Sequence, residues 1–314
     1  MNSNPEKPPL ILIVGPTASG KSSLALALSR LLPITVINAD ASQVYRDLNV
    51  VSARPTSEDL HRAPHRLFGH VDGALAYSAA AWATDARAAI ARSHASWRIP
   101  VLVGGTGLYV RTLLDGIAPV PEIDPAIRTS VRALAVGEAY AALLQEDPGA
   151  AQRLSANDTT RVARALEVVR STGKPLSQWQ EMRAGGIRDT VCLSPLVLLP
   201  PRDWLFQRCD ARFEAMLASG GKDEVAALLG RGLDPNLPVM RAIGVREIAA
   251  MLANPEHAER SIEDAKIATR QYAKRQYTWF RNQAPADWLR IDTQLDNDNI
   301  DDLAIKLQHM ALTD

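Results

Sequence analysis

The segment GPTASGKS, residues 15–22, restricts the possible folds of this chain more than any other part of the sequence. Two glycines separated by four residues, followed directly by Lys21 and Ser22, form the pattern of a phosphate-binding loop. Such a loop needs a strand before it and a helix after it, and an apolar run at 10–14 precedes this one. The sequence therefore predicts an α/β fold of the P-loop NTPase type. A glycine-rich turn that only caps a helix is the alternative.

Three more apolar runs predict buried strands of a parallel sheet flanked by helices: residues 34–37, 100–103 and 196–199. After the first strand, Leu24, Leu28 and Leu31 are spaced to form the buried face of a helix. Strand, loop, helix and strand in this order make the βαβ unit of an open sheet.

The third and fourth predicted strands are too far apart for one crossover helix. We expect residues 119–188 to form a helical insertion domain, with helices near 133–144 and 158–171. Residues 1–118 and 189–314 then form the core. The part after residue 202 is predicted to be helical, including a long helix at 262–281 and a solvated, acidic helix in the tail.

Composition limits the partners of this chain. Its 35 basic and 35 acidic residues balance, so any nucleic-acid surface must be local. Cys192 and Cys209 lack the spacing of a zinc site or a disulfide framework. No segment approaches the length of apolar sequence that a membrane span needs. We therefore expect a cytoplasmic protein without a membrane partner, acting as a monomer.

Asp40 follows the second predicted strand and lies at the carboxyl edge of the sheet, where open α/β folds bind ligands. This edge also holds the phosphate loop. Asp40 could bind Mg²⁺ through water or take a proton from an attacking nucleophile. The alternative is a structural aspartate that caps the following turn.

Basic residues gather in two predicted helices. Arg270, Lys274 and Arg281 share one face of the long helix, with Arg275 beside them and aromatic residues between them. This arrangement is typical of a surface that follows a nucleic-acid backbone and stacks bases. Arg161 and Arg164 lie one turn apart in the insertion. Charged helix faces are usually only solvated, so neither pattern identifies a nucleic-acid site by itself.

Several longer segments resemble one family in the same order along the chain. They are DASQVYRDLNVVSARPT, PHRLFGHVDGALAYSAAAW, VLVGGTGLYVRTLLDG, NDTTRVARALEVVRSTGKPLS, RAIGVREI and TRQYAKRQYTWFRN. With the phosphate loop, these segments resemble the signatures of tRNA dimethylallyltransferases, which prenylate the adenosine immediately 3′ of the anticodon. The resemblance extends from the loop to about residue 282.

The resemblance implies a phosphate loop that binds the diphosphate of dimethylallyl diphosphate while N6 of adenine attacks the allylic carbon. It implies three catalytic residues: Asp40 as general base, Thr106 near the nucleotide and Arg212 on the diphosphate. Mg²⁺ is expected at Ser22. The diphosphate-binding residues implied are Gly15, Pro16, Thr17, Ala18, Ser19, Gly20, Lys21 and Ser22.

The resemblance also implies a tRNA surface, with the target base drawn out of the anticodon loop into the protein. Its expected residues are Asp40, Ala41, Ser42, Gln43, Thr106, Arg128, Thr160, Arg161, Val162, Ala163, Arg164, Arg241, Ala242, Ile243, Gly244, Val245, Arg246, Lys274, Arg275, Gln276, Tyr277, Thr278, Trp279, Phe280 and Arg281.

The chain departs from the family pattern at a few positions, which leaves its fine specificity open. Ala41 replaces a serine, Val51 a glycine, Ser52 a threonine, Arg54 a lysine and Val245 a tyrosine. Two other functions remain as alternatives. A small-molecule kinase would also use a phosphate loop and a glycine-rich turn after the third strand. A non-catalytic RNA-binding protein would use the loop as a nucleotide switch and would tolerate Asp40→Asn.

Overall fold

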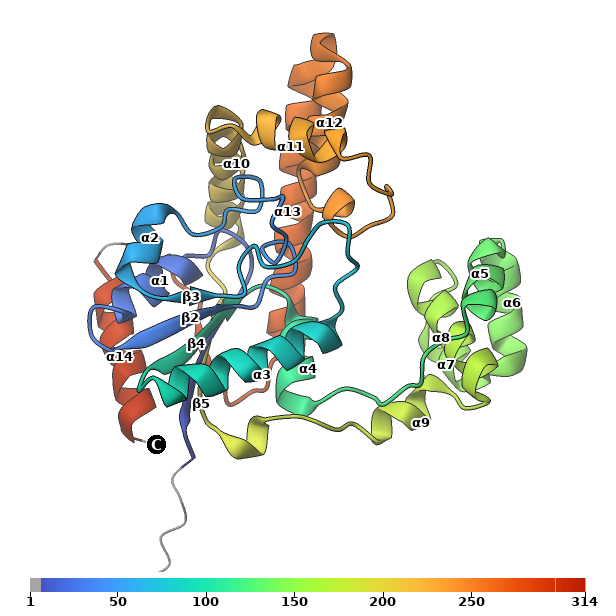
Figure 1. The fold of residues 1–314 in the computed structure, drawn as a ribbon, viewed down its shortest axis with the longest axis horizontal. Coiled ribbons are helices and arrows are strands. Elements are labelled where there is room, and N and C mark those ends of the chain that lie inside the picture. The colour runs from blue at the N-terminus through green and yellow to red at the C-terminus, as the bar shows by residue number, and fades with distance from the viewer. Residues whose placement is uncertain (1–6, 297, 314) are drawn as a thin grey trace, which may run out of the picture. The chain divides into compact units, whose positions relative to one another are not determined.

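A computed structural model describes residues 7–296 and 298–313 of the chain (Figure 1). The chain divides into two compact units. One contains the described residues up to Leu113 and those from Arg188 onward, and the other is Leu114–Ile187.

The first unit is built on a six-stranded, all-parallel sheet with the strand order β3-β2-β4-β1-β5-β6. Its strands are β1 (Pro9–Val14), β2 (Ile34–Asn38), β3 (His65–Arg66), β4 (Ile99–Gly104), β5 (Cys192–Leu198) and β6 (Leu289–Ile291). The four predicted strands are confirmed within a few residues. The two edge strands β3 and β6 were not predicted, because two or three residues are too short to give an apolar pattern.

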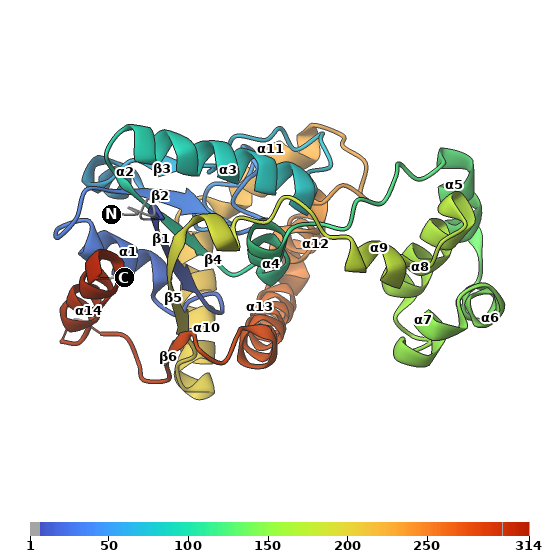
Figure 2. The same cartoon turned by 90° about the horizontal axis from the view of Figure 1, so that it is seen from below.

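Helices cover both faces of the sheet (Figure 2). Helices α1 (Lys21–Leu28) and α14 (Ile300–Thr313) pack together on one face, and α3 (Ala79–Ala95) lies on the other. The expected burial of Leu31 is wrong, since α1 ends at Leu28 and Leu31 is 38% exposed. The tail helix is more than a solvated cap, because Leu303 and Leu307 enter the main core.

The remaining elements of this unit lie beside the carboxyl edge of the sheet or connect its strands. They are α2 (Ser57–Arg62), α4 (Gly107–Asp115), α10 (Arg202–Ala218), α11 (Gly221–Gly230), α12 (Val245–Ala253), α13 (Ala258–Gln283) and the 3₁₀ turns Arg188–Thr190, Val239–Arg241 and Pro255–His257. The long α13 packs against α10 and α12 (Figure 1). Its inward face carries Ala265, Ala273 and Phe280.

The second unit is helical and has its own core around Leu143 and Leu166. Its helices are α5 (Pro125–Ala133), α6 (Val136–Glu146), α7 (Pro148–Arg153), α8 (Thr159–Thr172) and α9 (Leu176–Glu181). The predicted helix at 133–144 is wrong at its start, since α5 ends at Ala133 and α6 begins only at Val136. Glu138 accepts the Ala135 amide at 3.1 Å and so caps the start of α6. Ile117 and Ala184 pair through two 3.1 Å backbone hydrogen bonds, which hold the two ends of the unit together.

Candidate active site

The phosphate loop connects β1 to α1, as its sequence predicts. Gly20 caps α1 with φ at 97°, a left-handed conformation that glycine adopts without strain. Lys21 Nζ donates to the Pro16 carbonyl at 2.5 Å. Ser19 is buried, and its hydroxyl oxygen has no hydrogen-bond partner among the described residues. The loop therefore offers amides, a cation and a free hydroxyl to an anion at the N-terminus of a helix.

Gln276 of α13 ties this loop to the turn after β4. The Thr17 amide donates to Gln276 Oε1 at 2.8 Å, and Gln276 Nε2 donates to the Gly105 carbonyl at 2.9 Å. Glycine is required at 105, because a Cβ atom there would lie 2.1 Å from Gln276 Nε2. Gln276 is buried, and its expected contact with tRNA stays a prediction. Its side-chain amide joins the phosphate loop to the turn after β4.

A Gln276→Leu variant is expected to weaken diphosphate binding about 10-fold, because leucine of similar size leaves the Thr17 amide and the Gly105 carbonyl unpaired in a buried place. Isothermal titration with diphosphate measures the loss. Gln283→Leu, at an exposed position of the same helix, is the control and should bind normally. Equal affinity in the two variants would contradict the bridging role.

Two arginines of α10 reach the phosphate loop. The Arg212 guanidinium donates to the Thr17 hydroxyl, and Arg208 Nε donates to the Ala18 carbonyl at 3.0 Å. Burial lowers the pKa of Arg212, and the nearby Asp40 carboxylate opposes that shift. Arg208 was not predicted, although its spacing of one helical turn from Arg212 gave the signal.

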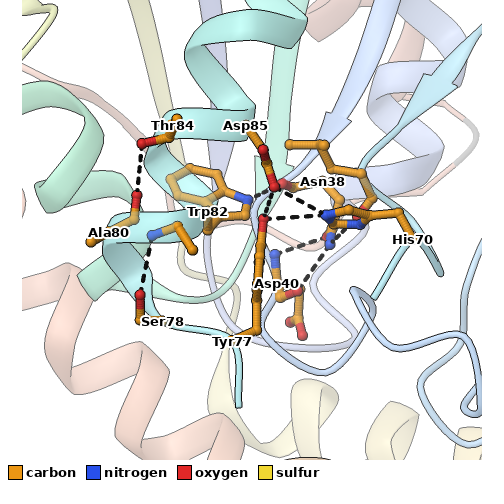
Figure 3. Close-up of polar contacts among 11 residues, drawn as sticks. Asn38, Asp40, His70, Tyr77, Ser78, Ala80, Trp82, Thr84 and Asp85 are labelled. Atoms are coloured by element: carbon orange, nitrogen blue, oxygen red, sulfur yellow. Dashed lines mark hydrogen bonds and ion pairs between the residues drawn. The ribbon is translucent and has the colours of Figure 1, made fainter. Parts of the chain in front are cut away.

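Asp40 lies in a turn just beyond β2 (Figure 3). The Asn38 amide side chain donates to the Asp40 carbonyl at 2.9 Å and accepts the Asp40 amide at 2.8 Å. Asp40 Oδ1 accepts the Ser42 amide at 2.9 Å. Trp82 Nε1 in turn donates to the Asn38 carbonyl at 2.8 Å. The carboxylate orders a local turn but caps no helix, since the next helix begins at Ser57.

A second cluster of polar side chains, which includes Asp85 of α3, lies near the Asp40 turn in Figure 3. The Tyr77 hydroxyl donates to Asp85 at 2.5 Å, and His70 Nε2 lies 3.2 Å from the same hydroxyl. Burial and the Asp85 carboxylate raise the pKa of Tyr77, so the phenol stays protonated and keeps its donor. These contacts fix the segment between β3 and α3.

Thr106 joins the Asp40 turn to the turn after β4. Its hydroxyl accepts the Ala41 amide at 3.0 Å, and its amide donates to the Ala39 carbonyl at 3.2 Å. Burial raises the pKa of Tyr272, Asp40 adds to the shift, and the nearby Thr106 hydroxyl opposes it. Tyr272 is a site residue that the sequence did not reveal, because only the fold brings α13 to this turn.

An open cleft of about 530 Å³ brings most of the predicted diphosphate-binding loop together with Asp40 and Arg212, while the predicted Thr106 is not among its lining residues. It is lined by loop residues 17–22, Asp40 and the α10 arginines. Burial lowers the pKa of Lys21 to about 8, the charge of Arg212 adds to that shift, and Asp40 opposes it. Because burial and a neighbouring cation disfavour the ammonium, a bound anion would restore its charge.

A smaller cavity of about 50 Å³ adjoins the cleft and shares Thr17, Asp40, Ser52 and Arg212 with it. Apolar side chains make up most of its remaining lining: Leu48, Val51, Phe213, Met216, Ala242 and Ile243. The site thus has a polar part suited to phosphates and an apolar part beside the same carboxylate.

The expected tRNA residues differ in exposure. Exposed positions are Arg128, Thr160, Arg161, Arg241, Arg246, Lys274, Arg275 and Arg281, and partly exposed ones are Ala41, Ser42, Gln43, Thr106, Ala163, Arg164, Ile243, Tyr277, Thr278 and Trp279. Val162, Ala242, Gly244, Val245, Gln276 and Phe280 are buried. These six residues lie below the protein surface, and their expected contacts with tRNA stay predictions.

The aromatic and basic face predicted for α13 is only partly correct. Phe280 is fully buried and meets Trp279 edge to face at 4.8 Å, so it cannot stack on a base. Arg270 is bound by Asp210 at 2.6 Å and Glu263 at 2.9 Å. Lys274 and Arg281 remain exposed on the outer face.

The second unit presents its own basic surface on α5 and α8. Arg132 Nε contacts Glu167 at 2.9 Å, and Arg164 lies 3.7 Å from the same buried carboxylate. Arg132 is 65% exposed and was not predicted, because its place beside Arg164 depends on how α5 packs on α8. Arg128 and Arg161 are exposed on the same two helices.

Comparisons with known proteins show the family of this chain. A family model described as IPP transferase matches residues 43–283, and one described as isopentenyl transferase matches residues 8–75. The chain belongs to the IPP transferase family. Family members named tRNA dimethylallyltransferase include one from Sphingopyxis alaskensis, 62% identical over 97% of this chain and 100% of the relative. Another, from Zymomonas mobilis, is 52% identical over 98% of both chains.

Solved structures of this family have the same fold. The tRNA isopentenylpyrophosphate transferase of Bacillus halodurans is 32% identical, with a TM-score of 0.70 over 97% of both chains. A eukaryotic dimethylallyltransferase acting on tRNA is 28% identical, with a TM-score of 0.81 over 95% of this chain and 77% of its own.

Proposed function

We propose that this chain transfers a dimethylallyl group from dimethylallyl diphosphate to N6 of the adenosine immediately 3′ of the anticodon in tRNA, and releases diphosphate. One observation carries the proposal: Asp40 lines the same cleft as Lys21, Arg208 and Arg212. A carboxylate can accept the proton of an attacking amine, while cations stabilise a departing diphosphate. The name of the relatives, tRNA dimethylallyltransferase, supports the same substrates.

The phosphate loop would hold the diphosphate of the donor. Its amides, Lys21 and the two α10 arginines surround the space where negative charge grows as the carbon–oxygen bond breaks. Donors aimed at developing charge accelerate a reaction more than they tighten substrate binding. Thr17, which is bound by both Gln276 and Arg212, keeps the loop in this geometry.

Asp40 would act on the acceptor. The N6 amine of adenine is a poor nucleophile, because its lone pair is delocalised into the ring. A carboxylate that takes its proton as the new carbon–nitrogen bond forms therefore raises the rate. The bond from the Ser42 amide orients the Asp40 carboxylate, and Thr106 fixes the neighbouring backbone.

The residues of the cleft fit Mg²⁺. Ser22 and Asp40 line it, and the unpartnered Ser19 hydroxyl adjoins it, so oxygen donors of the kind Mg²⁺ prefers are present. Ser22 would hold the ion, which leaves Asp40 to accept the proton of the nucleophile. When bound, Mg²⁺ supplies charge neutralisation of the diphosphate. The described residues contain no group of three or more His, Cys, Asp or Glu side chains suited to a metal, and a site completed by phosphates and water needs none.

The exposed cations and the partly exposed Arg164 would bind the tRNA backbone in each unit separately. In the first unit these are Arg241, Arg246, Lys274 and Arg281, and in the second Arg128, Arg161 and Arg164. Such contacts position an RNA without reading its sequence. The target base would leave its stack to reach Asp40, as enzymes acting on bases require.

The expected substrate bears on where the enzyme acts. We infer that the enzyme acts as a monomer in the cytoplasm, where tRNA is available. Cys192 and Cys209 are free thiols, which suits a reducing compartment. Within the part of the chain that the structure describes, no helix is long and apolar enough to cross a membrane.

The direct test combines the purified protein, Mg²⁺, dimethylallyl diphosphate and an anticodon stem-loop with adenosine after the anticodon. Mass spectrometry should find one added dimethylallyl group. A stem-loop with guanosine at the same place is the control and should stay unmodified. Absence of the product from the adenosine stem-loop, with the donor intact, would refute the proposal.

Affinity for diphosphate is expected to fall above pH 8. Lys21 of the free protein has its pKa near 8, and a bound anion raises that pKa, so binding takes up a proton at higher pH. Log Kd for diphosphate should rise by up to about one per pH unit above pH 8. Below pH 7, where Lys21 is protonated with and without diphosphate, Lys21 should contribute little change. Titrations in buffers of different ionisation enthalpy measure the proton uptake. Lys21→Arg, which keeps its charge, should lose this dependence.

A further inference from the structure

We propose that the small apolar cavity receives the prenyl chain and that Val51 closes it, so that the enzyme excludes allylic diphosphates longer than dimethylallyl. The inference rests on the proposed function, since it concerns the donor of that reaction. The cavity opens onto Thr17, Asp40 and Arg212, which also line the cleft for the diphosphate. A prenyl chain entering it would keep its reacting carbon beside these groups.

The volume of the cavity limits the length of the prenyl chain that it can hold. Its volume is about 50 Å³, and a water molecule needs about 10–15 Å³ on this measure, so there is room for about three to five heavy atoms. A five-carbon chain fits this space. A ten-carbon chain or an adenine ring does not fit without moving a wall.

The chemistry of the walls agrees with a hydrocarbon occupant. Leu48, Phe213, Met216 and Ile243 contribute apolar surface. Covering one methylene with such surface stabilises binding by roughly 0.8 kcal/mol. Size, rather than polarity, excludes a purine, because Ser42, Thr269 and Tyr272 also line the cavity.

Val51 fills the space between two helix starts. A Cβ atom added to Gly244, at the start of α12, would lie 3.1 Å from Val51 Cγ1 and 3.6 Å from Phe213 Cε2. A Cβ added to Gly221, at the start of α11, would lie 3.6 Å from Val51 Cγ2. Both methyl groups of the 7% exposed Val51 side chain therefore occupy space that the glycines leave open. Removing them would extend the cavity toward α11 and α12.

The backbone of this wall is held by Glu224 of α11. Glu224 Oε2 accepts the Val51 amide at 2.8 Å, while Oε1 accepts the Val50 amide at 3.1 Å and also the Asn49 amide. Arg231, near the end of the same helix, binds Asp47 and contacts Asp72 at 2.7 Å. A longer donor would have to displace this anchored segment, so the wall excludes allylic diphosphates that are longer than the cavity.

Val51 replaces the glycine of the signature that this segment resembles. Val51→Gly restores that pattern and should fold. Val136→Ala, at an exposed position of α6, is the control for a shortened valine. Val51→Ala removes part of the wall and provides a second test if the glycine variant is unstable.

Each protein is given equal concentrations of dimethylallyl diphosphate and geranyl diphosphate with the stem-loop, and the products are separated by mass. Unaltered protein and Val136→Ala should form only the five-carbon product. Val51→Gly should raise the geranyl to dimethylallyl ratio of kcat/KM at least about 10-fold, the effect of relieving one or two methyl-sized clashes. Val51→Ala should fall between them.

An unchanged ratio in Val51→Gly and Val51→Ala, with normal dimethylallyl transfer, would overturn the inference, as would efficient geranyl transfer by the unaltered protein. Donor binding is measured in parallel by protection against thermal unfolding. Tighter geranyl diphosphate binding by Val51→Gly supports the wall even if none of the proteins transfers a prenyl group. Absence of transfer by all of them would refute the proposed function and not the wall. Equal geranyl binding by all four proteins refutes the wall.

Discussion

An Asp40→Asn variant is expected to transfer the prenyl group about 10²–10⁴-fold more slowly than the unaltered protein, because it lacks the base that takes the N6 proton. Asparagine keeps an oxygen that can accept the Ser42 amide, so the turn after β2 is preserved. The rate is measured in single turnover, with donor and stem-loop saturating, so that product release does not mask the chemical step.

Affinity for the stem-loop separates this role from a role in RNA binding. We expect less than about a threefold change in Kd, since backbone contacts to exposed cations supply most of the affinity. Glu58→Gln, at an exposed position of α2, is the control for an altered carboxylate and should have normal rate and affinity. If Asp40→Asn lost rate and RNA affinity equally, the carboxylate would be a binding group rather than the base.

An Arg212→Ala variant is expected to lower kcat about 10²–10³-fold, because Arg212 lies where the leaving diphosphate gains charge and also holds the Thr17 hydroxyl. Arg212→Lys should recover part of the rate, since it restores a cation without the planar fork of donors. Initial rates over a range of donor concentrations separate kcat from KM.

Arg202→Ala is the matched control, because Arg202 is an exposed arginine at the start of the same helix. Its kinetics should be unchanged. A rise in KM alone in Arg212→Ala would show that the guanidinium binds donor and transition state equally, and would contradict its role in stabilising the leaving group.

The phosphate loop and the central strands could be predicted because their signals are local. Gly15, Gly20 and Lys21 define the loop within a few residues, and β1, β2 and β4 are continuous apolar runs. Asp40 could be placed at the cleft because parallel strands end at the same edge of a sheet. The positions of β3 and β6 depend on pairing with β2 and β5 and leave no pattern of their own.

The supporting contacts could not be predicted, because they join residues far apart in the chain. Gln276 looks like one more polar residue in a basic helix, yet it holds Thr17 and Gly105 together. Phe280 looks available for stacking, but the packing of α13 buries it. Glu224 reaches the Val51 segment only through the placement of α11. By contrast, Arg208 was detectable from its spacing to Arg212.

The central claim is that the cleft releases diphosphate from an allylic donor while no phosphoryl group moves. The most direct measurement gives the protein ATP, dimethylallyl diphosphate and the adenosine stem-loop together, and counts diphosphate released, prenylated adenosine formed and ATP consumed. We expect one diphosphate for each prenylated adenosine, with ATP unchanged. Consumption of ATP without any prenylated stem-loop would contradict the account and favour a kinase.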